Sequence, residues 1–135
     1  MSLSNTAETA ILEQIFKGTA LPWNANTDLW VALHTADPGE AGTAVTSEAT
    51  YTSYARVPVD RATEFTVTTN TIENTLLLQF PQSTGGSNVI TYASIVTTAS
   101  GAGDIIVRAA LSGSITVTSG VQPQFAAGSL TFTID

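Results

Sequence analysis

Asp28-Leu29-Trp30-Val31-Ala32-Leu33-His34 is the stretch of sequence that decides the fold. Its leucine and valine side chains fall on one side of an extended chain, and the tryptophan, alanine and histidine fall on the other. A period of two predicts a β-strand, and the apolar residues in both sets indicate that both faces are at least partly covered. Asp37-Pro38-Gly39 then predicts a turn, because proline fixes φ and glycine accepts positive φ. We expect a long, exposed loop from residue 35 to about residue 50.

Short strands separated by glycine-containing turns fill the chain after this loop. We place them at residues 54–59, 64–68, 71–80, 89–97, 104–111, 114–117 and 130–134. Pro58 lies in the first of them and indicates an edge strand or a bulge, because proline cannot donate a ladder hydrogen bond. Seven or eight strands without intervening helices predict a mostly β protein, a jelly-roll-like antiparallel β-sandwich.

One helix is predicted upstream, over about residues 6–17. Asn5 and Glu8 have the spacing of a capping box, Lys17 suits the negative end of the helix dipole, and Gly18 provides a left-handed stop. An apolar stripe of helical period runs along it, formed by Ala7, Ile11, Leu12, Ile15 and Phe16. We therefore expect a helix and connecting loop over residues 1–27, with Trp23 as an apolar plug, and a β-sandwich domain over residues 28–135.

Composition excludes several classes of function. Eleven acidic against four basic residues give a net charge of -7, which argues against nucleic acid or an anionic membrane as partner. The absence of cysteine removes thiolate chemistry and disulfides. Residues 1–16 lack the basic region of a signal peptide, and no run approaches the ~20 apolar residues of a membrane span. We expect a soluble protein.

The polar residues are mostly small hydroxyls, with 23 threonines and 12 serines but one lysine. Serine and threonine lose little side-chain entropy when they are covered, so this surface suits a protein packed among other proteins. The alternative is a β-rich surface that is simply rich in threonine.

Candidate catalytic residues are few. His34 is the single imidazole and a conceivable general base, oriented by Asp28, Asp37 or Glu40, but its place at a strand end favours a bond to a loop carbonyl. No Gly-x-Ser-x-Gly motif presents a serine. We expect no enzyme activity.

Acidic residues provide no recognisable site either. Asp37 and Glu40 lie in a glycine-containing loop, yet they lack the spacing of a calcium-binding loop. A glycosidase-like pair of carboxylates has no local signal that distinguishes it from solvated acids; the available residues are Asp60, Glu64, Glu73 and Asp104. We expect no cofactor and no metal.

Arg56 and Arg61 are half of the cations of the chain and flank Pro58, close to Asp60 and Glu64. They suit an ion pair within the chain or, alternatively, one between subunits.

Three segments together carry a resemblance to a known family. They are Ser4-Asn5-Thr6-Ala7-Glu8, the strand-turn Val31-x-Leu33-His34-Thr35-x-Asp37-Pro38-Gly39, and Tyr54-x-Arg56. Over about residues 4–60 the chain resembles a family of small virion proteins of tailed bacteriophages, whose members include capsid decoration or cement proteins and tail or fibre components.

The resemblance implies a non-enzymatic structural protein of the virion, assembled in the host cytoplasm. Our first expectation is a capsid decoration or cement protein, a homotrimer bound to the major capsid protein; the alternative is a tail or fibre component involved in host-surface attachment. Aromatic and arginine side chains dominate such contacts, although core packing within one subunit remains the alternative for the apolar ones. The candidate interface residues are Ile15, Phe16, Trp23, Trp30, Arg56 and Arg61.

Overall fold

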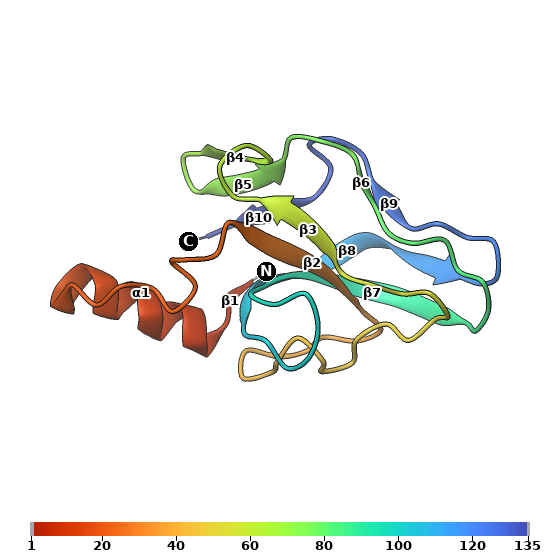
Figure 1. The fold of residues 1–135 in the computed structure, drawn as a ribbon, viewed down its shortest axis with the longest axis horizontal. Coiled ribbons are helices and arrows are strands. Elements are labelled where there is room, and N and C mark those ends of the chain that lie inside the picture. Colours follow the sequence, from red (N-terminus) through yellow and green to blue (C-terminus); the bar gives the residue numbers. More distant parts are fainter. Residues whose placement is uncertain (1, 135) are drawn as a thin grey trace.

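Strand β2 (Asp28–His34) is an inner strand of the larger sheet in the computed structural model, which describes residues 2–134 (Figure 1). It pairs antiparallel with β7 (Asn88–Val96) on one side and with β3 (Val57–Asp60) on the other. β8 (Ile105–Val117) and the two-residue β1 (Ser2–Leu3) complete the order β1-β8-β7-β2-β3. The predicted strand at residues 28–34 is confirmed at both ends, and Pro58 lies on an edge strand as predicted.

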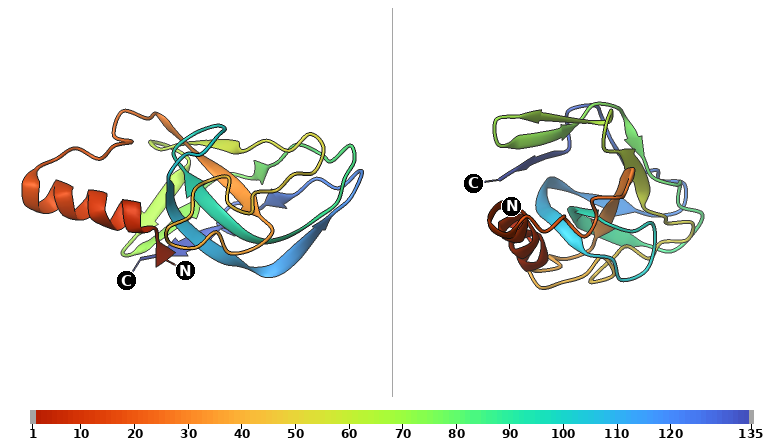
Figure 2. Two further views of the ribbon diagram at one scale, coloured as in Figure 1. Left: turned by 90° about the horizontal axis from the view of Figure 1, so that it is seen from below. Right: turned by 60° about the vertical axis from the view of Figure 1, so that its left-hand side comes forward.

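The second layer consists of two small antiparallel sheets. β4 (Phe65–Thr68), β5 (Thr71–Asn74) and β10 (Thr131–Thr133) form one in the order β10-β5-β4, and β6 (Leu78–Gln79) pairs with β9 (Gln124–Phe125) in the other. Figure 2 shows the β4–β5 hairpin and β10 above the larger sheet. The predicted mostly β fold, an antiparallel sandwich with one N-terminal helix, is confirmed.

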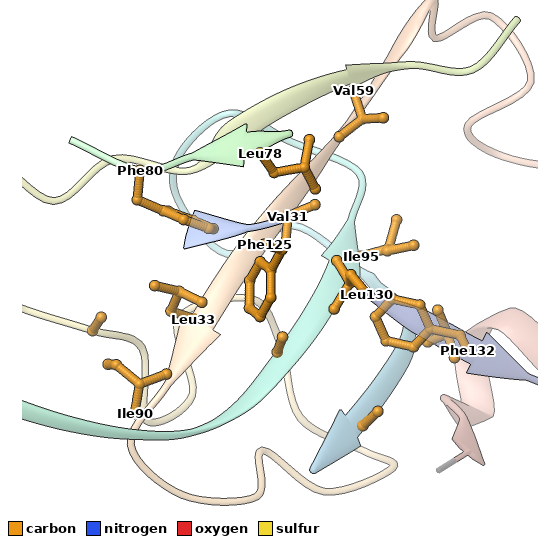
Figure 3. Close-up of a cluster of buried hydrophobic side chains, with 14 of the residues drawn as sticks. Val31, Leu33, Val59, Leu78, Phe80, Ile90, Ile95, Phe125, Leu130 and Phe132 are labelled. Carbon is orange, nitrogen blue, oxygen red and sulfur yellow. The ribbon is translucent and has the colours of Figure 1, made fainter. Parts of the chain in front are cut away.

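The core lies between the two layers, where side chains of β2, β3 and β7 meet those of the segments around β6, β9 and β10 (Figure 3). Val31 and Leu33 face it from alternate positions of β2, as the period of two requires. Each large side chain of this kind contributes roughly 1.5–3 kcal/mol when fully buried. The opposite face of β2 is covered too, because Ala32 packs with Ala44, Val96 and Ile105 and Trp30 lies against them.

Helix α1 (Asn5–Lys17) begins one residue earlier than predicted, and its cap is Ser4 instead of Asn5. Ser4 Oγ accepts a hydrogen bond from Ala7 N at 3.1 Å and donates one to the carbonyl oxygen of Ile105 on β8. Serine therefore caps the helix and fastens it to the sheet at the same time. The predicted end of the helix is confirmed. Gly18 has φ of 69°, and its backbone N–H donates to carbonyl oxygens of the last helical turn, those of Gln14 and Glu13. Among residues 2–134 no helix has the length and apolar character needed to cross a membrane.

The apolar stripe predicted along α1 does not pack as one surface. Ala7 and Ala10 are buried against Trp23, so that tryptophan is the plug that the sequence predicted. Leu12, Ile15 and Phe16 are instead exposed, because the C-terminal half of the helix extends beyond the sandwich (Figures 1 and 2).

The strand predicted at residues 71–80 is interrupted after Asn74. The Asn74 side chain is buried, with Nδ2 donating to the carbonyl oxygens of Leu76 and Ala126 and Oδ1 accepting from Leu130 N. These bonds turn the chain out of one small sheet and into the other. The strand predicted at residues 54–59 is likewise shorter and begins only at Val57.

The two strands predicted at 104–111 and 114–117 are one continuous strand, β8. The expected turn at Ser112-Gly113 is wrong, because β8 bulges away from β7 between Ala110 and Ile115 without reversing direction. β1 and β9 were not predicted, since two-residue strands carry no periodicity. The loop after β2 is less exposed than expected: Ala44 and Ala49 are buried, and Glu48 bridges back to His34.

Candidate functional site

The six residues predicted for an interface do not form one site. Ile15 and Phe16 lie on the outer face of α1, 65% and 78% exposed. Trp23 is buried beneath the helix, and Trp30 is half-buried on the outer face of the larger sheet. Arg56 and Arg61 both have partners within the chain.

Arg61 closes the segment that connects α1 to β2. Its Nη1 donates to the carbonyl oxygens of Trp23 and Asn26, each at 2.9 Å. Its guanidinium thus binds backbone rather than the neighbouring Asp60 or Glu64, and it holds the turn around Trp23 against the end of β3.

Arg56 forms a buried, bidentate ion pair with Glu48. Nε lies 2.6 Å from Glu48 Oε1 and Nη2 lies 2.8 Å from Oε2, which is the planar geometry in which arginine binds carboxylates best. The remaining donors reach the carbonyl oxygens of Thr98 and Gly101. Arg56 therefore joins the β2–β3 connection to the β7–β8 loop. The intrachain ion pair, one of the two alternatives, is present, but its acid is Glu48 and not one of the acids close to Arg56 in the sequence.

Tyr54 links the Arg56–Glu48 ion pair to strand β2. Its hydroxyl donates to Glu48 Oε1 at 3.0 Å and accepts from Leu33 N on β2 at 3.0 Å. Burial raises the pKa of the Tyr54 phenol, so the donated proton stays in place at neutral pH. The Tyr54-x-Arg56 motif thus binds the loop to the sheet.

Asp37 and Glu40, weighed as cation ligands, face an arginine instead. Arg108 Nε on β8 lies 3.2 Å from Asp37 Oδ1, and Arg108 Nη2 lies 3.9 Å from Glu40 Oε1. The Asp37 side chain also accepts from Gly39 N, and Gly39 has φ of 76°, so the predicted turn chemistry is confirmed. No group of three or more metal-ligating side chains occurs within residues 2–134.

His34 is fully buried and bonded at both nitrogens. Nδ1 lies 2.8 Å from the carbonyl oxygen of Thr46, and Nε2 lies 2.7 Å from Ser94 Oγ. Since a carbonyl only accepts, Nδ1 carries the proton and Ser94 donates to Nε2. The predicted bond to a loop carbonyl is confirmed.

We expect the stability of the chain to fall in mild acid because of His34. Burial lowers the pKa of this imidazole below 6.5, so the unfolded chain takes up a proton before the folded one does. The contribution is fully present above pH 6.5 and is lost as the pH falls from there to the lowered pKa of the folded state. Urea unfolding at a series of pH values checks this; the H34Q variant should lose that part of the pH dependence, and an unchanged slope in H34Q would contradict it.

Several small or open cavities occur within residues 2–134. One of about 200 Å³ lies beside Trp23 and Asp104, and a groove of about 370 Å³ runs between β8 and the segment from β9 to β10. An open hollow of about 410 Å³ lies beside Asp60 and Arg61. The buried charges and the imidazole hold loops to the sheet.

The outer face of α1 is an accessible apolar surface, where Leu12 lies next to Ile15 and Phe16 and all three are exposed. The helical stripe was the signal that could have identified it.

Comparison with known proteins finds one family. A family model described as "Podophage GP4 fiber I protein gp80" (Gp80) matches residues 2–133. No curated protein matches the chain.

Proposed function

The chain belongs to the Gp80 family of podophage fiber proteins, and from that premise we propose that it is a structural component of a phage tail fibre. The family identifies it as a phage virion structural protein, in agreement with the resemblance of its first half. The match over residues 2–133 is the observation that carries the proposal, because it includes the helix and both layers of the sandwich.

The match favours the fibre alternative over the capsid decoration expected first. A contact with the major capsid protein would follow from a decoration role and is not part of the present proposal. Attachment to the host surface is the finer function that we propose for the fibre, with recognition through exposed loops on the rigid sandwich.

We propose that the chain acts by packing and binding and catalyses no reaction. Two structural facts support this. The single imidazole is buried with both nitrogens bonded, and the buried Arg56–Glu48 pair uses its polar atoms to bind loops. Neither group is free to act as a base or to bind a substrate.

The assembly that we propose is a homotrimer of 14.0 kDa chains. The hydroxyl-rich surface supports it, because threonine and serine have few rotamers to lose on packing. Light scattering coupled to size-exclusion chromatography measures the mass of the purified chain directly, and a monomer at all concentrations would contradict a stable trimer.

Antibody labelling of intact virions tests the fibre proposal. We expect label confined to the tail region, together with a low copy number when quantitative mass spectrometry compares this chain with the major capsid protein. Label over the head with hundreds of copies per virion would instead support decoration and overturn the fibre assignment.

A further inference from the structure

The outer face of α1 presents large apolar side chains to solvent. Leu12 is 56% exposed, Ile15 65% and Phe16 78%, and together they form the apolar α1 face. They lie on the side of the helix away from Ala7 and Ala10, the two residues that pack against Trp23. A shallow depression of about 290 Å³ runs along this face between Leu12 and Phe16, bordered by Thr9, Glu13 and Lys17. Three neighbouring exposed residues of this size are typical of a surface that another protein covers.

Charge is distributed unevenly between the two ends of the molecule. Residues 74–103 and 109–134 contain no charged side chain, and they include all of β6, β7, β9 and β10 and most of β8. The end with the β6–β9 pair is therefore uncharged (Figure 1). The charged residues within residues 2–134 lie on α1, on β2 and β3 and the segments next to them, on the β4–β5 hairpin, and at the start of β8, where Asp104 and Arg108 are found.

Acidic groups outnumber basic ones at the end of the molecule that carries α1, which we call the helix end. Among residues 2–134, six carboxylates have no ion pair with a cation: Glu8, Asp28, Asp60, Glu64, Glu73 and Asp104. Asp28 and Asp60 lie opposite each other where β2 begins and β3 ends, directly after the segment from α1. Lys17 is paired with Glu13, and Arg61, which binds backbone oxygens, is the one cation near these six carboxylates that has no acidic partner within residues 2–134. The carbonyl end of the α1 dipole adds partial negative charge next to Phe16.

We propose that the apolar α1 face docks into an apolar groove bordered by lysine or arginine on a different protein of the virion, and so attaches the chain to the particle. The inference rests on the proposed function. The kind of partner follows from charge complementarity. The apolar groove of the partner accepts Leu12, Ile15 and Phe16, and the basic residues at the edge of that groove face the acidic helix end. In a helix-in-groove contact, residues at i, i+3 and i+4 are the usual anchors, which is the spacing of these three.

A second copy of the chain is the less suitable occupant. Two α1 faces in contact would bring two acidic ends together, including Glu8 of each copy, which lies one helical turn before Leu12. Contacts between copies would avoid this repulsion at the uncharged end instead.

Virions that carry variants of the chain test the docking. In L12Q/F16Q, glutamine keeps the helix propensity high, and both positions are exposed, so the isolated variant should fold like the wild type. The matched control is V45Q/V89Q, which also replaces two half-exposed apolar residues but lies outside α1. We expect L12Q/F16Q to lower the copies per virion at least tenfold in quantitative mass spectrometry, while the control stays at the wild-type level.

Salt provides the second measurement. Binding of the purified wild-type chain to particles that lack it should weaken several-fold between about 0.05 and 0.5 M NaCl, because salt screens contacts between charged rims. Binding that does not change with salt would contradict the proposal that lysine or arginine borders the groove of the partner.

The remaining outcomes separate the two proposals. Wild-type incorporation of L12Q/F16Q would overturn the docking and leave the fibre role standing, whereas absence of the wild-type chain from virions would overturn both. A mass of the purified chain that falls from oligomer to monomer in L12Q/F16Q would show that a second copy covers the face, which also overturns the docking.

Discussion

Replacing Arg56 with alanine should lower the free energy of unfolding by about 3–5 kcal/mol, the range observed when one partner of a buried ion pair is removed. The variant leaves Glu48 with a negative charge in a site where its side chain is only 15% exposed. It also removes the donors that hold Thr98 and Gly101. Urea unfolding followed by tryptophan fluorescence measures the loss, and a change below about 1 kcal/mol would show that water replaces the guanidinium at low cost.

The matched control is K17A, which removes the cation of the exposed Lys17–Glu13 pair at 3.2 Å. Pairs of this kind on a helix surface contribute only about 0.3–0.5 kcal/mol. The double variant E48A/R56A gives a further check, because it leaves no unpaired charge behind. We expect it to lose less stability than the two single variants added together.

Replacing Phe80 with alanine should lower the free energy of unfolding by a similar 3–5 kcal/mol for a different reason. Phe80 is fully buried between Tyr54, stacked at a centroid distance of 6.3 Å, and Phe125, edge-on at 6.1 Å. Its removal leaves a cavity between the layers, since aromatic neighbours on both sides have little freedom to collapse into it. Thermal or urea unfolding monitored by circular dichroism measures the effect.

F16A is the natural comparison, because it removes the same side chain from a position that is 78% exposed. We expect F16A to change the stability of the isolated chain by no more than about 0.5 kcal/mol. A loss as large as that of F80A would mean that Phe16 packs within the chain, and it would also remove the basis for docking through the apolar α1 face.

Local signals in the sequence predicted the elements that they encode directly. Strand β2 follows from a period of two, the end of α1 from Lys17 and Gly18, and the turn after β2 from Asp37-Pro38-Gly39. The edge position of β3 follows from Pro58, because a proline in an inner strand would leave a ladder acceptor without its donor. In each case a few neighbouring residues carry the whole physical cause.

The predictions from sequence are wrong where a residue far away in the chain determines the local structure. Ser4 replaces Asn5 as the cap because only Ser4 also reaches β8, about a hundred residues away in sequence. The break after Asn74 depends on backbone atoms of Ala126 and Leu130, and β8 continues through Gly113 because it bulges beside β7.

The candidate site divides in the same way. The aromatic and arginine residues were identified by type, but Arg56 pairs with Glu48 because the loop bridges back to His34, which nothing near either residue indicates. The sequence also did not decide whether an apolar side chain lies in the core or on the surface. Trp23 and Phe16 were both candidate interface residues, but the structure buries Trp23 and exposes Phe16.

By itself, the sequence determined a mostly β sandwich with an N-terminal helix, a chain with few charged residues, and the class of phage virion proteins. Periodicity, capping and turn chemistry act over a few neighbouring residues, so they can be interpreted without knowing how the rest of the chain folds. Only the tertiary structure decided that the helix overhangs the sandwich and leaves Leu12, Ile15 and Phe16 uncovered, with acidic groups gathered at that end. Burial is a property of everything that packs around a side chain, and no local pattern contains it.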